Sequence, residues 1–139
     1  YSNKVHDGFL GHSYIGEWVN IGAGTNNSNL KNNYGSVKIQ YKDSILDTKL
    51  QFFGCFMGDY SRLAIGTNIN TGTYIGLGTN LFNHDFSTKY ISSFSWGDNQ
   101  VVKIDSLIET IKKMKKRRNK KVSSSEEQLM GFLYKKISI

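Results

Sequence analysis

Three histidines are the side chains of this sequence best suited to acid–base or metal chemistry: His6, His12 and His84. An imidazole titrates at a pKa of about 6.5, so one histidine can serve as a general base near neutral pH. A zinc site needs three imidazoles that converge on one ion. His6 and His12 are one six-residue repeat apart and should leave different sides of the repeat described below, so we expect no metal site.

The segment after His6 is suited to a flat or extended ligand. Gly8 and Gly11 follow the histidine, and the run VNIGAGT occupies Val19–Thr25. Small residues let a ligand approach the backbone, and the amides of Asn20 and Asn29 offer hydrogen-bond donors and acceptors. On spacing alone His6 is either a base at this site or an ordinary surface or corner residue.

The elements that must position these residues keep a period of six. The apolar series is Phe9, Ile15 and Ile21, then Met57, Leu63, Ile69, Ile75 and Leu81, and the small hydroxyl series is Ser61, Thr67, Thr73 and Thr79. A helix repeats every 3.6 residues and a simple strand every 2, whereas the coils of a parallel β-helix give a period of six. The sequence therefore predicts a mainly β fold, a parallel β-helix with aliphatic side chains stacked inside.

The hexads also predict the organisation of the chain. We assign residues 1–104 to the β-helix, with a polar loop insertion at about 27–50, and residues 105–139 to a helical C-terminal tail. The insertion is rich in Asn and contains a strand at Val37–Tyr41; after it the hexads run for about two coils, and residues 87–104 look irregular. Because the repeat is already running at Phe9 and the chain begins with Tyr1, we expect an upstream part.

The tail predicts two helices, each opened by a capping box. The boxes pair Ser106 with Glu109 and Ser123 with Glu126. The expected apolar stripes are Leu107, Ile108, Ile111 and Met114 in the first helix and Leu129, Met130, Leu133 and Ile137 in the second. We expect them to cover the wall or open end of the β-helix. Trp18 and Tyr60 look like exposed wall residues suited to self-association.

The positive charge and the single cysteine limit which partners and which cellular compartment the sequence suggests. The net charge is +7, and residues 103–139 account for all of it, mainly through Lys112–Lys121. This block lacks the aromatic residues that stack on bases, so we expect no nucleic acid and instead a basic segment near phosphorylated ligands. No run approaches the ~20 apolar residues of a membrane span, so we expect no membrane contact. Cys55 fits a small core residue in a reducing cytoplasm.

A family resemblance adds to this interpretation. The run HDGFLGHSYIGEWVNIGAGT from His6 to Thr25, then Asn29, resembles the acetyltransferase domain of the bifunctional glucosamine-1-phosphate N-acetyltransferase / N-acetylglucosamine-1-phosphate uridylyltransferase family. The histidine stands at the same distance before Leu-Gly and before Asn-Ile-Gly-Ala-Gly-Thr. The resemblance extends to about Gly97, and the later motifs are similar to sugar-nucleotidyltransferase-like proteins common in Bacteroidetes.

The resemblance implies a left-handed β-helix, a homotrimer with ligand clefts between subunits, and acetyl-CoA as co-substrate. It implies that His6 is the base in acyl transfer to the amine of an amino-sugar 1-phosphate, a step in nucleotide-sugar and cell-envelope precursor synthesis. Asn20 matches a sugar-phosphate contact, and Ala23 and Asn29 match acetyl-CoA contacts. Magnesium would belong only to an upstream nucleotidyltransferase domain.

Two positions depart from the family pattern. Phe9 stands where a Tyr hydroxyl contacts the sugar, and Ile65 stands where a Ser contacts the cofactor. Lys31 is the nearest candidate for a phosphate contact after the motif. The departures favour an alternative function, a catalytically silent trimerisation domain of a sugar nucleotidyltransferase.

Overall fold

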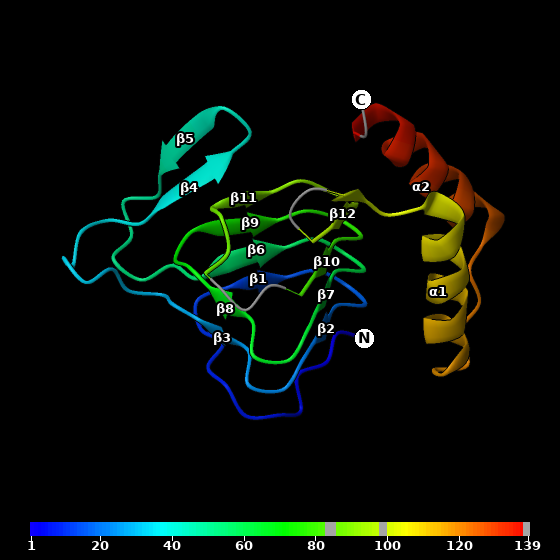
Figure 1. The fold of residues 1–139 in the computed structure, drawn as a ribbon, viewed down its shortest axis with the longest axis horizontal. Coiled ribbons are helices and arrows are strands. Elements are labelled where there is room, and N and C mark those ends of the chain that lie inside the picture. Colours follow the sequence, from blue (N-terminus) through cyan, green and yellow to red (C-terminus); the bar gives the residue numbers. More distant parts are fainter. Residues whose placement is uncertain (83–85, 98–99, 138–139) are drawn as a thin grey trace.

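The computed structural model describes residues 1–82, 86–97 and 100–137. The protein is mainly β, with short strands in parallel sheets followed by two helices, as predicted (Figure 1). The strands are β1 (Tyr14–Ile15), β2 (Asn20–Ile21), β3 (Asn26–Asn27), β4 (Lys38–Tyr41), β5 (Ser44–Asp47), β6 (Cys55–Met57), β7 (Arg62–Leu63), β8 (Asn68–Ile69), β9 (Thr73–Ile75), β10 (Asn80–Leu81), β11 (Tyr90–Ile91), β12 (Ser95–Trp96) and β13 (Gln100–Val101). The helices are α1 (Ile104–Lys116) and α2 (Ser124–Ile137). Neither helix is long and apolar enough to cross a lipid bilayer, within the described residues.

The chain visits three parallel sheets in a fixed order. β1, β6, β9 and β11 form one sheet; β2, β7, β10 and β12 pair in parallel in a second, with β13 antiparallel at its edge; β3 and β8 form the third. The strands therefore group into four stacked layers: β1–β2–β3, β6–β7–β8, β9–β10 and β11–β12 (Figure 1). Each layer bonds to the layers on either side of it.

The register of the strands matches the six-residue repeat. Met57 pairs with Ile75, eighteen residues later, which is three hexads per layer. Ile15 pairs with Met57, and here the spacing is 42 residues, longer by the 24 residues of the insertion at 27–50. Ile91 pairs with Ile75 only sixteen residues later. The expectation of an irregular stretch at 87–104 is thus wrong: β11 and β12 form a fourth layer, which the shortened spacing concealed.

The core lies between the sheets. The apolar series from Met57 to Leu81 is buried, and so are Cys55 and the hydroxyl residues from Ser61 to Thr79. The hydroxyls are satisfied by corner carbonyls: Thr67 Oγ1 donates to the Ala64 carbonyl at 2.8 Å. Phe9, expected to lead a hexad, is instead exposed. The backbone N–H of Asn27 donates to the Phe9 carbonyl at 3.0 Å, and the next residue, Leu10, packs against the core in place of Phe9.

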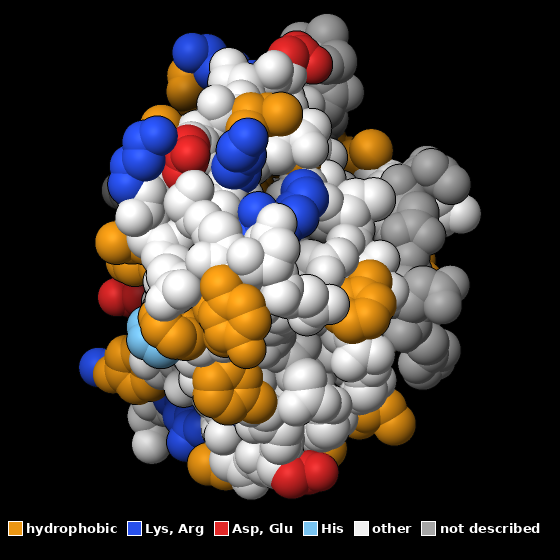
Figure 2. Space-filling model, turned by 90° about the vertical axis from the view of Figure 1, so that its left-hand side faces the viewer, with side chains coloured by type: hydrophobic (Ala, Val, Ile, Leu, Met, Phe, Trp, Pro, Cys, Tyr) orange, Lys and Arg blue, Asp and Glu red, His pale blue; other side chains and the backbone are white. Residues whose placement is uncertain are grey.

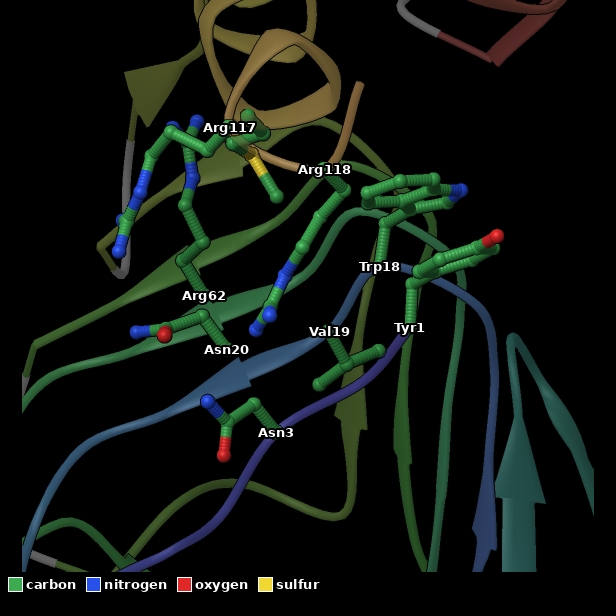
Figure 3. A pocket seen from close by; sticks show the side chains of 9 residues that line it. Tyr1, Asn3, Trp18, Val19, Asn20, Arg62, Arg117 and Arg118 are labelled. Carbon is green, nitrogen blue, oxygen red and sulfur yellow. The ribbon is translucent and has the colours of Figure 1, made fainter. Parts of the chain in front are cut away.

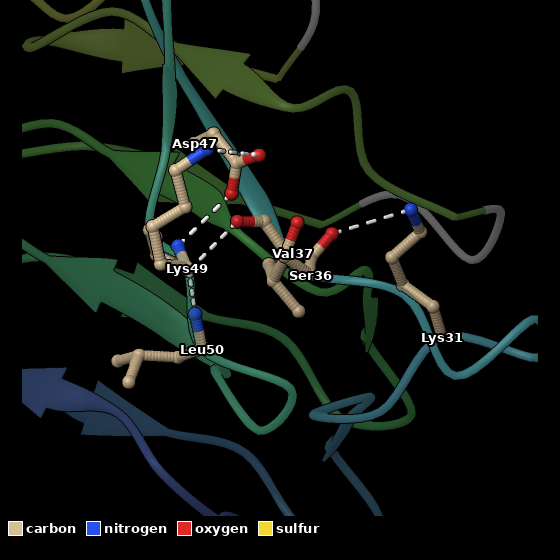
Figure 4. Close-up of polar contacts among 7 residues, drawn as sticks. Lys31, Ser36, Val37, Asp47, Lys49 and Leu50 are labelled. Carbon is tan, nitrogen blue, oxygen red and sulfur yellow. Dashed lines mark hydrogen bonds and ion pairs between the residues drawn. The ribbon is translucent and has the colours of Figure 1, made fainter.

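The insertion forms an antiparallel hairpin, β4–β5, that projects from one side of the stack (Figure 1). A strand was expected at Val37–Tyr41, and β4 spans Lys38–Tyr41. The base of the hairpin is held by polar contacts (Figure 4). Asp47 accepts from the backbone N–H of Lys49 at 2.9 Å and from Lys49 Nζ at 3.3 Å. The backbone N–H of Lys49, helped by the Ser36 side chain, lowers the pKa of Asp47 to about 2.

Of the two capping boxes expected at the starts of the helices, only one forms. Ser123 Oγ accepts from the backbone N–H of Glu126 at 3.2 Å, next to the start of α2. The box expected at Ser106 is wrong, because α1 begins two residues earlier and Lys103 occupies the N-cap without a side-chain bond. Leu107, Ile111 and Met130 are buried as expected, while Leu129 is exposed.

A corner of the stack, which we call the aromatic corner, carries Trp18, Tyr60 and Phe94 at equivalent positions in three layers. All three have positive φ, between 59° and 63°. Trp18 and Tyr60 were expected on an exposed wall. Instead, all three rings are buried with Leu107 and Met130 of the helices. The helical tail covers this corner, which corrects the expectation.

We predict that Ile75→Ala lowers the free energy of unfolding by about 2–5 kcal/mol, because it leaves a cavity in the stacked core. Ile65→Ala is the matched control, since that side chain is exposed and should change the stability by less than about 0.5 kcal/mol. Urea unfolding followed by circular dichroism measures both. Similar losses for the two variants would contradict the stacked core.

Candidate functional site

The first residues of the chain lie along the VNIGAGT segment. The backbone N–H of Asn3 donates to the Val19 carbonyl at 3.0 Å, and Asn3 bridges Asn20 in parallel. Four residues on, the Gly24 N–H donates to the Asp7 carbonyl at 3.3 Å. The segment from Asn3 to Asp7, which contains His6, is thus held along the segment from Val19 to Gly24, which contains Ala23.

His6 is exposed at this corner. Within the described residues its imidazole makes no hydrogen bond, which leaves both ring nitrogens open to solvent or to a ligand. The backbone around it is held by Lys4, whose Nζ donates to the carbonyls of His6, Asp7 and Gly8 at 3.2, 2.8 and 2.6 Å. The loop that carries the imidazole is therefore tied down although the ring is open.

Asn29, the second predicted cofactor contact, lies against His12 instead. Asn29 Nδ2 is 2.7 Å from His12 Nδ1, and the His12 ring lies 5.4 Å from that of Phe52. The Phe9 ring and the Asn29 amide both crowd the position where Gly11 lacks a side chain. Figure 2 shows a histidine beside hydrophobic side chains on the face at the left of Figure 1. Sequence reasoning gave His12 no role, and its contact with Asn29 makes it a rival to His6.

Lys31 lies at a hollow between the insertion and the layers. Lys31, Lys38 and Lys89 line a cavity of about 250 Å³ with Ile39, Gln40 and Ile45. Lys31 Nζ donates to the Ser36 carbonyl at 3.3 Å (Figure 4). Burial, with the charge of Lys31 added to it, lowers the pKa of Lys89. An anion in this hollow would face three ammonium groups and no carboxylate.

Asn20 lines a second hollow, which we call the arginine pocket (Figure 3). It has a volume of about 290 Å³ and lies between the second sheet and the end of α1. The lining residues are Tyr1, Asn3, Trp18, Val19, Asn20, Arg62, Met114, Arg117 and Arg118. Three of the nine are arginines and none is acidic, so the pocket has the chemistry of an anion site.

Arg62 stands in a polar row on the outer face of the sheet. Asn20 pairs with Arg62, and Arg62 pairs with Asn80 in the following layer. Arg62 Nε and Asn80 Nδ2 are buried and have no hydrogen-bond partner among the described residues. Burial lowers the pKa of Arg62, yet a guanidinium stays charged at neutral pH. The row therefore presents a fixed cation with unused hydrogen-bonding capacity.

A partly buried polar cluster fixes the end of α1 over the arginine pocket. Lys115 Nζ contacts both carboxylate oxygens of Glu126 at 2.5 and 2.6 Å, and the Tyr60 hydroxyl donates to the same carboxylate. Lys115 also lies 5.4 Å from the centre of the Trp18 ring. Burial by itself would raise the pKa of Glu126, but the bonds from Lys115 and Tyr60 outweigh burial and lower it. Burial, together with that carboxylate, raises the pKa of Tyr60.

The predicted site residues are therefore divided among separate places. The loop that carries His6 runs along the segment that contains Ala23, Asn29 and Phe9 lie near His12, Lys31 lines the lysine hollow, and Asn20 lines the arginine pocket. His84 lies outside the described residues. Sequence reasoning missed Arg62, Arg117 and Arg118 as a group, although the basic block at Lys112–Lys121 was a signal for two of them.

Comparison with known proteins gives one partial match. No protein-family model matches the chain. A segment of 75 residues is 35% identical to the "Bifunctional sugar-1-phosphate nucleotidylyltransferase/acetyltransferase" of Sulfurisphaera tokodaii, and it covers 54% of this chain and 19% of that protein. The match thus spans about a fifth of the length of the relative. It supports similarity to a transferase of that general kind.

We predict that Glu126→Gln reduces the pH dependence of stability. Because the pKa of Glu126 in the folded protein is below its ordinary value of 4.5, the ionised group stabilises the fold above that pH, and the contribution is lost as the pH falls through the folded pKa. Urea midpoints of the wild type should therefore drop more between about pH 7 and pH 3 than those of the variant. Glu127→Gln is the control, since its 3.1 Å ion pair with Lys112 is at the surface. Equal pH profiles for the wild type and Glu126→Gln would contradict the role of the cluster.

Proposed function

We propose that this chain is a left-handed parallel β-helix domain that transfers an acetyl group from acetyl-CoA to the amine of an amino-sugar 1-phosphate. The proposal includes membership of the sugar-1-phosphate nucleotidyltransferase/acetyltransferase family, relation to its Bacteroidetes-type members, and a cytoplasmic role in nucleotide-sugar synthesis. The repeated order of the three sheets and the eighteen-residue register support the β-helix. The name of the partial relative supports acetyl or nucleotidyl transfer.

The observation that supports the proposal is the course of the loop that carries His6. Backbone hydrogen bonds of Asn3 and Asp7 hold this loop along the Gly-rich segment that the resemblance assigns to acetyl-CoA. A general base must come within hydrogen-bond reach of the proton it abstracts. His6, in an exposed position with no ring hydrogen bond among the described residues, is available for that contact.

The proposed reaction forms one bond and breaks one. The sugar amine attacks the thioester carbonyl carbon while His6 accepts a proton from the amine nitrogen. Backbone N–H groups near the Gly-rich corner stabilise the tetrahedral oxyanion, which is often the largest electrostatic contribution in acyl transfer. The intermediate collapses, the carbon–sulfur bond breaks, and the thiolate of CoA takes the proton back from His6. Asn20 and Lys31, which line separate hollows of one chain, are each proposed as a contact to the sugar phosphate, and Asn29 is proposed as a contact to CoA.

We predict that His6→Ala lowers the rate of acetyl transfer by roughly 10²–10⁴, the usual contribution of a general base. The assay follows the N-acetylated product by mass spectrometry with acetyl-CoA and a panel of amino-sugar phosphates, glucosamine 1-phosphate among them. His12→Ala is the matched control and should act more weakly, through its contact with Asn29. A larger loss for His12→Ala than for His6→Ala would transfer the role of base to His12.

We further propose that the chain works as a homotrimer. Aromatic residues remain exposed on the layers, and the set comprises Phe9, Tyr14, Phe52, Phe82, Phe86 and Trp96. Exposed apolar patches of this kind mark interfaces in soluble proteins. Trp18 and Tyr60 no longer support the trimer, because the helical tail buries them.

Sedimentation equilibrium checks this prediction. At tens of micromolar the expected mass is three times the 15.7 kDa of one chain, as the burial of a sizeable apolar surface favours association. A monomer at that concentration would exclude a cleft built between subunits.

A catalytically silent scaffold is the second candidate function. Phe9 and Ile65, which replace polar contacts of the family, are both exposed, so neither is retained for packing in the core. A trimer that transfers no acetyl group to any amino-sugar phosphate in the panel would support this function over the first.

A further inference from the structure

The arginine pocket places three guanidinium groups around one small cavity. Arg62 comes from β7, and Arg117 and Arg118 follow the last turn of α1 (Figure 3). No ion pair joins any of the three to a carboxylate within the described residues, whereas Lys112 and Lys115 nearby are both paired. Like charges held at short range repel one another, and a bound anion relieves that repulsion. The ion pairs of α1 therefore use Lys112 and Lys115, and they leave the three arginines available to a ligand.

The wall of the pocket also holds a hydrogen-bond donor that the protein does not use. Arg62 Nε is buried without a partner among the described residues, and an unpaired buried donor is costly. Asn3 and Asn20 add two side-chain amides to the same lining. This polar row belongs to the sheet, so it is independent of the basic block on the helix. Two separate parts of the sequence thus supply the same chemistry to one cavity.

The size and the aromatic contacts define the anion. A cavity of about 290 Å³ holds a phosphate group and a little of the molecule attached to it. The Trp18 ring stacks on Tyr1 with centroids 4.3 Å apart, and cations lie over both rings: Lys115 over Trp18 and Lys120 over Tyr1. The Trp18 ring is buried by these contacts and is not open to a nucleobase. Guanidinium groups match the tetrahedral oxygens of phosphate through paired hydrogen bonds.

We infer that the arginine pocket is a binding site for the phosphate group of a small phosphorylated ligand, gripped by Arg62, Arg117 and Arg118. Asn3 and Asn20 provide the neutral contacts. Within our proposed function this phosphate has two sources, the sugar 1-phosphate and coenzyme A. The assignment itself needs no acetyl transfer, because it concerns binding alone.

Isothermal titration calorimetry on the full 139-residue chain tests the site. The probes are inorganic phosphate, glucosamine 1-phosphate, coenzyme A and 3′-dephospho-coenzyme A. Arg118→Gln should weaken the bound probe roughly tenfold or more, the scale of a lost charge-assisted hydrogen bond. Arg118→Lys keeps the positive charge but loses the paired N–H donors of the guanidinium. Its affinity for the probe should therefore lie between those of the wild type and Arg118→Gln. Lys135→Gln removes a charge from the last turn of α2 and should leave the affinity unchanged.

The probes distinguish the two sources. A loss confined to glucosamine 1-phosphate assigns the pocket to the sugar, and a loss seen with coenzyme A but not with its dephospho form assigns it to the 3′-phosphate. A weakening by Lys135→Gln as large as that by Arg118→Gln would show diffuse attraction and overturn the site. So would the absence of binding of all four probes at millimolar concentration.

Thermal unfolding gives a second readout that does not depend on catalysis. Phosphate should raise the unfolding temperature of the wild type, since a ligand that binds only the folded state stabilises it. Arg62→Gln should unfold cooperatively and lose that rise, and an undiminished rise would contradict the role of Arg62. A failure of acetyl transfer leaves both binding measurements untouched, so the two proposals fail separately.

Discussion

Backbone pairing between equivalent residues of successive layers is the constraint on which the rest of the structure depends. Each strand is only two to four residues long, too short to be stable in isolation, and gains its hydrogen bonds from the layer before and the layer after it. A one-residue slip would turn Ile75 outward and Tyr74 inward, which couples the register to the core. The close approach at Gly22, where a Cβ would come 2.5 Å from the Ala64 carbonyl carbon, shows how little room the layers leave.

The aromatic corner connects this stack to the helices. A left-handed backbone costs roughly 1–2 kcal/mol for a residue other than Gly, and Trp18, Tyr60 and Phe94 all adopt it. Burying each ring returns about 2–3 kcal/mol or more, so the corner is favourable only with the helices in place. Glu126 and Lys115 then fix the helix orientation. The arginine pocket depends on this docking, since Arg117 and Arg118 reach the sheet only when α1 lies there.

The structural features that repeat along the chain were predicted from the sequence. Features that depend on a single contact between distant residues were not. The hexads identified the buried series from Met57 to Leu81 because the period is a property of the chain itself. Ile91 was not predicted as a core residue, because it follows Ile75 by sixteen residues and so falls outside the six-residue period. Trp18 and Tyr60 were placed on an open wall because nothing local shows that residues more than forty positions later cover them. The grouping of Arg62 with Arg118 could not be predicted for the same reason.

The aromatic corner has a consequence for the order of assembly. On a ribosome the layers emerge before the tail and can pair one upon another as they appear. The three rings stay uncovered until α1 and α2 have been synthesised. The nascent stack therefore carries an exposed apolar stripe along one edge. Interrupted synthesis, or proteolytic cutting between Val102 and Leu107, would leave that stripe permanently bare. The corner is therefore covered only while α1 and α2 remain attached and packed against it.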